Sequence, residues 1–378
     1  MVQIQFLGTD VVRALVPVFS LKPGKALFFY DGRDIPARWS SNVEKAIRHR
    51  LPDTDLTFTK VDCRDFDAVR MALYRSFASF DDPDIVFVTS GGTEVAAAAG
   101  QMVARQVGGR VVFADLKEGR IRDVRTGDTV VPAENASIDD YLTTIGAKRI
   151  RDSHSLPSKE DEARIFAAAE WTFSNLDAWH ALQQYLASSC SAEGRMTFTL
   201  PERIRYNGTG YDSASAIRVF REQRFVVREG EEFRFPDSAC REYMTTFGIW
   251  LELYVYFKAQ YWFDEVYLGF VIDWDSSDLV DTVDNEIDVL AVRDSVPCFI
   301  SCKMRKPVPK DLYEVAYLAN RFGGESARAL VATTYPVSSE KDLKSGLYNR
   351  FRKMGIGALE VREFSEKKAA SVFRRALK

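Results

Sequence analysis

Short apolar runs alternate with amphipathic stretches along the first 145 residues. Apolar runs of this length predict buried strands, and an apolar stripe at helical spacing predicts a helix packed on one face. The predicted strands are 3–7, 26–30, 56–62, 84–89 and 110–116, and the predicted helices are 40–51, 65–80 and an Ala-rich stretch ending at Gly108-Gly109. Strands that alternate with helices are typical of a mainly parallel sheet, so we expect an α/β fold with a Rossmann-like domain over residues 1–145.

The middle of the chain is patterned differently. Residues 146–158 have no apolar periodicity and are interpreted as a linker. A long helix is predicted from Lys159 to Ser188, then a helix over 213–223 and a hairpin over 225–235. This helix–hairpin order is winged-helix-like, so we interpret 159–237 as a connecting region that either reads DNA or only packs between domains.

The last part, 238–378, returns to an α/β pattern. A very apolar helix is predicted over 238–260, and an amphipathic helix over 310–322. Strands are predicted at 265–272, 285–292, 298–304 and 329–335. We therefore expect a second α/β domain over this range.

Charge is distributed unevenly. The 378 residues carry a net charge of −3, which excludes a uniformly basic nucleic-acid-binding surface. Residues 261–300 hold ten acids and one base, whereas 341–378 hold eleven bases and four acids. These blocks are either two solvated faces or a carboxylate cluster beside a phosphate-binding surface.

Cysteine and histidine usage narrows the chemistry. The five cysteines are scattered without a CxxC pair, which is typical of reduced thiols, and we expect a cytoplasmic protein. The three histidines are far apart in the sequence, which argues against a zinc site or a Ser-His-Asp triad. No apolar stretch reaches the length of a membrane span, so no membrane partner is expected.

The strongest candidate for chemistry lies on two neighbouring strands. Because strand side chains alternate, Glu286 and Asp288 share one face of their strand, as Ser301 and Lys303 do of the next. The connection 293–297 is short enough for a hairpin, which places Asp288 beside Lys303. Carboxylates can hold Mg²⁺ or Mn²⁺ and a lysine can stabilise phosphorane charge, so this patch suits phosphodiester hydrolysis. The alternative is a cross-strand ion pair of no functional consequence.

A third acid gives the pattern a family resemblance. Glu252 lies in the very apolar helix, where an unpaired carboxylate would be expensive to bury. With GIWLELYVY, NEIDVL, ISCK and LYEVAYLANRFGG, the last domain resembles the PD-(D/E)xK restriction-endonuclease-like core. The resemblance implies that Glu252, Asp288 and Lys303 are active-site residues.

One position departs from that family. Ser301 stands where the family has an acid two residues before the lysine. Glu286 is our first candidate for the substitute and Glu314, on the following helix, the second; the Cys302 carbonyl is a further possible ligand. The predicted catalytic set is Glu252, Glu286, Asp288, Ser301 and Lys303, with Glu252, Glu286 and Asp288 as ligands of Mn²⁺ or Mg²⁺.

The first domain holds a second constellation. The segment TSGGTE (89–94) joins a buried strand to a helix, and its two glycines allow backbone N–H groups to approach an anion. Thr9 and Asp10 follow the first strand and should lie at the same sheet edge. Neither GxGxxG nor a P-loop occurs, so nicotinamide and ATP chemistry have little support. The alternative is a tight turn that binds nothing.

The segments FLGTD and TSGGTE resemble those of CARF domains, which are sensors of cyclic oligoadenylates made in type III CRISPR defence. In this order, the two halves resemble CARF-fused PD-(D/E)xK effectors. That resemblance implies a homodimeric endonuclease for DNA, RNA or both, activated by cyclic tetra-adenylate. The implied ligand-binding residues are Thr9, Asp10, Thr89, Ser90, Gly91, Gly92 and Thr93. The alternative is a cyclic-oligoadenylate-sensing, DNA-binding regulator with a degenerate nuclease domain.

Overall fold

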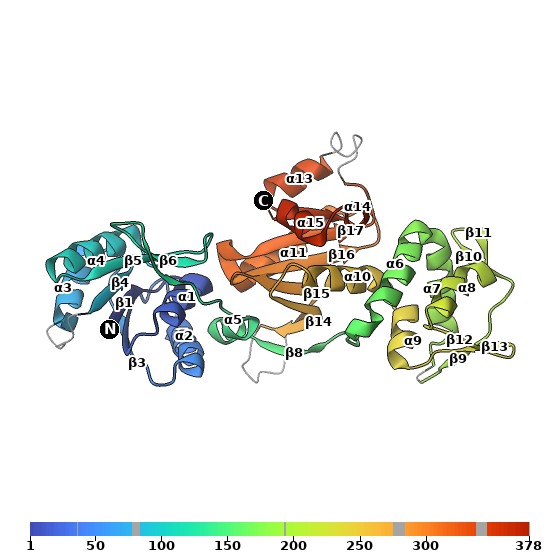
Figure 1. The fold of residues 1–378 in the computed structure, drawn as a ribbon, viewed down its shortest axis with the longest axis horizontal. Helices are drawn as coiled ribbons and strands as arrows, with labels where there is room; N and C mark the ends of the chain where they lie inside the picture. Colours follow the sequence, from blue (N-terminus) through green and yellow to red (C-terminus); the bar gives the residue numbers. More distant parts are fainter. Residues whose placement is uncertain (36, 78–83, 193, 275–283, 338–345, 378) are drawn as a thin grey trace.

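The structure is a computed structural model that describes residues 1–35, 37–77, 84–192, 194–274, 284–337 and 346–377. Three parts lie in a row, with the C-terminal domain between the N-terminal domain and the helical connecting region (Figure 1). Among the described residues, no helix is long and apolar enough to cross a membrane.

The N-terminal domain is built on a seven-stranded sheet of order β3-β2-β1-β4-β5-β6-β7. The first five strands in this order, β3, β2, β1, β4 and β5, run parallel to one another, and β6 and β7 add an antiparallel edge. The strands are β1 (Val2–Phe6), β2 (Lys25–Tyr30), β3 (Asp55–Lys60), β4 (Ile85–Val88), β5 (Arg110–Asp115), β6 (Arg120–Asp123) and β7 (Thr129–Pro132). This order confirms the predicted Rossmann-like α/β fold.

Helices cover both faces of this sheet. α1 (Val11–Leu21) and α2 (Ala37–Arg50) share a core with one face, and α3 (Phe66–Phe77) and α4 (Glu94–Gln106) with the other. The sequence pattern did not predict α1. Its residues are apolar except for Arg13 and Ser20, and Pro17 lies inside it, a residue that usually interrupts a helix.

The C-terminal domain contains a six-stranded sheet of order β18-β17-β16-β15-β14-β8. Its strands are β8 (Lys148–Asp152), β14 (Glu265–Asp273), β15 (Asp284–Arg293), β16 (Val296–Lys303), β17 (Arg328–Thr333) and β18 (Gly357–Glu360). Its helices are α10 (Ile249–Gln260) on one face, α11 (Pro309–Gly323) on the other, and α13 (Leu347–Lys353), α14 (Glu363–Glu366) and α15 (Ala369–Ala376).

The segment interpreted as a linker contains an edge strand of this sheet. β8 pairs antiparallel with β14, so residues 148–152 belong structurally to the C-terminal domain. Four of its five residues are exposed, and only Ile150 is apolar. An edge strand with little buried surface has no alternating pattern to read, which is why the sequence suggested a linker.

Both long helices predicted around the connecting region are broken. One becomes a 3-10 turn (Lys159–Asp161), α6 (Glu162–Ser174) and α7 (Leu176–Ser189), with the break at Asn175. The other becomes α9 (Ser238–Thr245) and α10, separated at Gly248, which has a left-handed φ of 88°. Apolar periodicity continues across both breaks and hides them.

The connecting region also contains α8 (Ser213–Glu222) and short strands β9 (Thr197–Phe198), β10 (Arg203–Tyr206), β11 (Thr209–Asp212), β12 (Val227–Glu229) and β13 (Glu232–Arg234). Its core is continuous with that of α10, where Trp179, Phe220 and Trp250 pack edge to face or tilted.

A second core crosses from the N-terminal domain to the C-terminal one. Helix α5 (Ile138–Ile145) carries Tyr141, whose ring stacks on Phe322 of α11 at 5.2 Å. The Tyr141 hydroxyl donates a hydrogen bond of 2.8 Å to the Ser295 carbonyl in the β15–β16 turn. The hairpin of β15 and β16 is therefore packed directly against α5, the helix that leaves the N-terminal domain.

Candidate functional site

The predicted hairpin of β15 and β16 is present. The strands pair antiparallel from Val289–Ile300 to Arg293–Val296, and the two turn residues, Asp294 and Ser295, have φ of 50° and 64°. Two left-handed residues in succession are typical of a type I′ turn. The hairpin fixes which side chains of the two strands can meet.

Asp288 and Lys303 meet as the sequence predicted. Asp288 Oδ2 accepts a hydrogen bond of 2.6 Å from the Cys302 N–H and lies 3.3 Å from both Lys303 Nζ and Ser301 Oγ. Burial lowers the pKa of Lys303, but the charge and hydrogen bond of Asp288, together with Cys302 and Asp311, outweigh burial, and the net shift is upward. Lys303 therefore stays a cation suited to stabilising negative charge, not a base.

Ser301 does not replace the missing acid. Its hydroxyl contacts Asp288, and a small cavity of about 60 Å³ opens beside it. Glu286 and Glu314 both line that cavity with Asp288 and Lys303. Both candidates for the substitute acid thus lie close to the site, one from the sheet and one from α11.

Glu252 approaches the same end of the sheet from α10. It is only 8% exposed. Burial above all, with the negative charges of Asp288 and Glu286, raises the pKa of this carboxyl from 4.5 to about 7, although its contact with His154 acts in the opposite direction. The charge of Asp288 also reaches the buried Cys302 thiol, whose pKa is raised chiefly by burial.

His154 is the residue at this site that the sequence did not indicate. Its Nδ1 lies 2.8 Å from Glu242 Oε1, and its Nε2 lies 3.0 Å from Glu252 Oε2 and 3.5 Å from Glu286 Oε1. Burial alone would lower the pKa of His154, but its contacts with Glu242 and Glu252 raise it to about 10. The only sequence signal was a lone histidine between two serines in a segment interpreted as a linker.

The predicted metal ligands are near one another but not gathered round one point. In the part of the chain that the structure describes, no three His, Cys, Asp or Glu side chains are arranged to hold a metal ion. The carboxylates of Glu252 and Glu286 face His154, and that of Asp288 faces Lys303.

The two predicted ligand loops of the N-terminal domain lie side by side. A Cβ added at Gly91 would lie 2.5 Å from the Phe6 carbonyl oxygen, and Gly91 has a φ of 114°. Glycine is therefore required where the loop after β4 crosses the end of β1. Thr93 caps α4 by accepting a hydrogen bond of 3.1 Å from the Ala96 N–H.

The hydroxyls of Thr89, Ser90 and Thr93 form hydrogen bonds within the fold. Thr89 contacts the Val112 carbonyl at 3.2 Å, and Ser90 Oγ accepts a hydrogen bond of 2.8 Å from the Ala114 N–H. Thr9 lines a cavity with Trp39, whose ring nitrogen donates to the Gly8 carbonyl at 3.2 Å. Trp39 is thus a packing residue of this loop.

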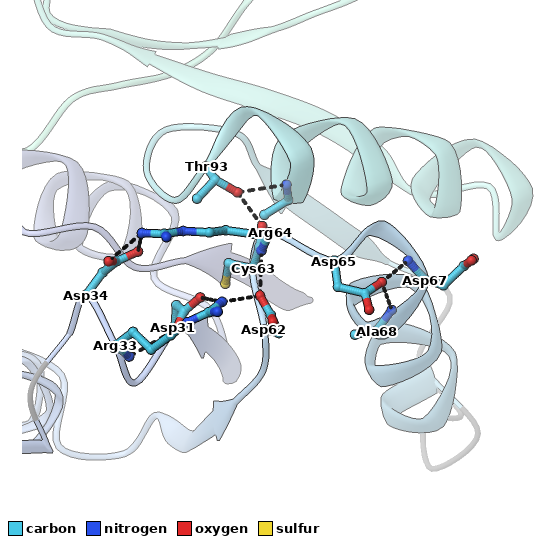
Figure 2. A network of polar contacts seen from close by, with 11 residues as sticks. Asp31, Arg33, Asp34, Asp62, Cys63, Arg64, Asp65, Asp67, Ala68 and Thr93 are labelled. Carbon is cyan, nitrogen blue, oxygen red and sulfur yellow. Dashed lines mark hydrogen bonds and ion pairs between the residues drawn. The ribbon is translucent and has the colours of Figure 1, made fainter.

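An ion-pair network occupies the neighbouring sheet edge (Figure 2). Arg33 bridges Asp31 and Asp62, and Arg64 pairs with Asp34 at 2.8 Å. The hydrogen bond with Arg33 lowers the pKa of Asp31 well below its ordinary value. The Thr93 hydroxyl donates to the Cys63 carbonyl and joins this network to α4.

Sequence reasoning missed this network. A signal was present, since the DGRD segment (31–34) and the DCRD segment (62–65) each follow a strand with the same spacing of acids and arginine.

Comparison with known proteins identifies the fold. No family model and no curated protein matches the sequence. Protein VC1899 from Vibrio cholerae matches over 99% of this chain and 97% of its own, with a TM-score of 0.80 at 17% identity. Can2 from Sulfobacillus thermosulfidooxidans, solved in complex with cyclic tetra-adenylate, matches over 100% and 99%, with a TM-score of 0.69 at 16% identity. The chain has the fold of these proteins.

A third structure matches in part. A type III CRISPR defence DNA nuclease activated by cyclic oligoadenylate aligns with 88% of this chain and 45% of its own, with a TM-score of 0.52 at 15% identity. At such identities the similarity establishes the shared architecture, whereas activity depends on the residues of the site.

Proposed function

We propose that this protein is a metal-dependent endonuclease activated by cyclic tetra-adenylate in type III CRISPR defence. The observation that carries the proposal is the Asp288–Lys303 pair at 3.3 Å, with Glu252 buried behind it and Glu286 beside it. Of the similar structures, Can2 was solved in complex with cyclic tetra-adenylate, and another is a DNA nuclease activated by cyclic oligoadenylate. These similarities support the choice of activator and of reaction class.

The donor atoms of this site are of the type that a hard divalent cation prefers, although among the described residues the three carboxylates do not surround one point. Asp288, Glu252 and Glu286 offer carboxylate oxygens, which Mg²⁺ and Mn²⁺ prefer. Asp288 and Glu252 would hold the cation, with Glu286 as the third acid. When bound, such a cation lowers the pKa of water and stabilises charge on the phosphate.

The chain's own residues supply the rest. Lys303 holds a positive charge 3.3 Å from the Asp288 carboxylate, where it can stabilise the charge that develops on a scissile phosphate. Asp288 in turn is held by the Cys302 N–H, so its position is fixed by the backbone of the neighbouring strand. This rigid placement is what a phosphodiester-cleaving site requires.

The sensor function is assigned to the N-terminal sheet edge. In the proposal, Thr9, Asp10 and the segment Thr89–Thr93 bind the cyclic tetra-adenylate. Two copies of the chain would pair about a two-fold axis, because the ligand itself is two-fold symmetric. The nucleic-acid substrate is DNA, RNA or both.

A cleavage time course tests the proposal. Supercoiled plasmid, single-stranded DNA and RNA are each incubated with Mn²⁺ or Mg²⁺, with and without cyclic tetra-adenylate. We expect cutting of at least one substrate that requires both the metal and the ligand. Absence of cutting from a protein that binds the ligand tightly would overturn the nuclease assignment.

One observation favours a second candidate, a ligand-sensing regulator that binds DNA without cutting it. Ser301 supplies a hydroxyl where an acid would complete the carboxylate set. The regulator would bind one duplex sequence preferentially and leave it intact, which a binding assay followed by electrophoresis of the recovered DNA distinguishes from cleavage.

A further inference from the structure

Three consecutive residues, Ser153, His154 and Ser155, hold three glutamates from three different elements. Glu242 belongs to α9 and receives hydrogen bonds from the Ser155 N–H at 3.1 Å and from the Ser155 hydroxyl at 2.7 Å. The Ser153 hydroxyl donates to Glu286 of β15 at 2.5 Å.

The imidazole of His154 lies at the centre of this arrangement. Its Nδ1 contacts Glu242 at 2.8 Å, and its Nε2 lies between Glu252 at 3.0 Å and Glu286 at 3.5 Å. The side chain is only 10% exposed, so few rotamers are open to it.

Gly269 allows the segment 153–155 to lie close to β14. The Ser153 N–H donates to the Gly269 carbonyl at 2.7 Å. Gly269 has a φ of 57°, and a Cβ there would collide with the Ser153 hydroxyl. Glycine inside a strand is typical of a place where another backbone approaches closely, and here it lets the segment lie against β14.

Repulsion among the neighbouring carboxylates explains why a group that fixes their positions is needed. Glu252, Glu286 and Asp288 bring three carboxylates to one end of the sheet, where like charges repel. Asp288 is held by Lys303 and the Cys302 N–H. Within the described residues, the group that contacts both remaining carboxylates is His154.

We propose that His154 is a positioning residue that orients Glu252 and Glu286 toward the cation-binding site, with its own ring oriented by Glu242. The inference rests on the proposed function and deepens it. Groups that orient metal-binding carboxylates contribute about 10- to 100-fold to metal affinity in known sites. Glu242 would act one step further out, through the ring that it holds.

Mn²⁺ affinity measured by electron paramagnetic resonance of the free ion tests the inference without any substrate. The full-length proteins compared are wild type, His154→Ala, His154→Gln and Glu242→Gln, with Asp288→Ala as the variant that removes a ligand. We expect His154→Ala to weaken Mn²⁺ binding about 10- to 100-fold. His154→Gln should recover part of the loss, because its amide can still donate to one carboxylate.

Glu242→Gln is expected to weaken binding less than His154→Ala, about two- to tenfold, since the ring keeps its place but loses its orienting charge. His49→Ala, at an exposed position on α2, is the matched control and should bind Mn²⁺ like wild type. If His154→Ala does not fold, as judged by thermal unfolding, the other two variants carry the test.

The outcomes separate the two proposals. Equal or tighter Mn²⁺ binding by the position-154 variants would overturn the positioning role, while metal-dependent cleavage by wild type could still stand. Wild-type protein that binds no Mn²⁺ at all would overturn both.

Discussion

The Ser326 hydroxyl donates a hydrogen bond of 2.7 Å to Asp10 Oδ2. Asp10 lies in the predicted ligand loop and caps α1 through its other carboxylate oxygen, which accepts from the Arg13 N–H at 2.9 Å. Ser326 ends the short 3-10 helix (Gly324–Ser326) that follows α11. Since Glu314 of α11 lines the candidate active-site cavity, α11 and the 3-10 helix after it connect that cavity with the predicted ligand loop.

Removing this hydrogen bond should uncouple the two sites. We expect Ser326→Ala to keep its affinity for cyclic tetra-adenylate within about threefold, while ligand-dependent stimulation of cleavage falls about five- to tenfold, a coupling change of ordinary size. Calorimetric titration and cleavage rates with and without ligand measure the two quantities. Ser174→Ala, which removes a hydroxyl from exposed α6, is the control. Unchanged stimulation in Ser326→Ala would contradict the coupling role.

Asp288 and Lys303 should be indispensable for cleavage. Asp288→Ala and Lys303→Ala are each expected to lower kcat at least about 100-fold, because the first removes a proposed ligand of the cation and the second removes the positive charge that would stabilise the reacting phosphate. Ligand affinity should remain as in wild type, since the predicted ligand loops belong to another sheet. Lys310→Ala, at an exposed position of α11, provides the matched control. Near wild-type cleavage by either site variant would refute the site assignment.

The acid that compensates for Ser301 can be identified by a pair of substitutions. Glu286 shares a histidine contact with Glu252, whereas Glu314 reaches the cavity from α11. We therefore expect Glu286→Gln to lower the cleavage rate at least about tenfold, because it would remove a group of the metal site. Glu314→Gln should lower the rate less than about threefold, because Glu314 would lie at the periphery of that site. The reverse order would assign the role to the helix.

Stability should fall as the pH rises through the range in which His154 and Glu252 titrate. In the folded protein the pKa of Glu252 is raised from 4.5 to about 7, and that of His154 from 6.5 to about 10. The folded state thus binds more protons than the unfolded state from about pH 4.5 to 10, so both groups lower the free energy of unfolding as the pH increases. Each contributes at most about 1.4 kcal/mol per pH unit within its own window.

Urea unfolding at pH 5, 7 and 9 checks this expectation. The double variant His154→Gln/Glu252→Gln keeps Glu242, Glu286 and Asp288 but removes both titrating groups. Its stability should vary less with pH than that of wild type over this range. Parallel pH profiles for the two proteins would show that the shifts do not occur.

Gly91 offers a test of the loop geometry. Gly91→Ala would place a Cβ 2.5 Å from the Phe6 carbonyl oxygen in a left-handed conformation. Gly108 also has a positive φ, of 72°, but has open space around the position of a Cβ. Thermal unfolding should show that Gly108→Ala lowers the free energy of unfolding by about 1 kcal/mol, the effect of a left-handed backbone alone. Gly91→Ala should lower it clearly more. Gly91→Ala should also lose ligand affinity, because the loop must move; equal effects of the two substitutions would contradict the close approach.

The sequence by itself determined the α/β architecture and the Asp288–Lys303 pair. Both depend on local rules: the alternation of strands with helices predicts the parallel sheet, and a short turn with period-two side chains places Asp288 beside Lys303. Interactions between neighbouring strands of a hairpin are close in the chain, so the pattern of residues is enough to predict them.

Only the tertiary structure decided what surrounds that pair. His154 lies 132 residues before Glu286 in the sequence. It follows the exposed edge strand β8, and this part of the chain has no apolar periodicity. The hydrogen bond from Ser326 to Asp10 likewise joins two loops from opposite ends of the chain. Such contacts depend on how the two sheets pack against α5 and α11, and packing between distant segments leaves no spacing in the sequence from which they could be predicted.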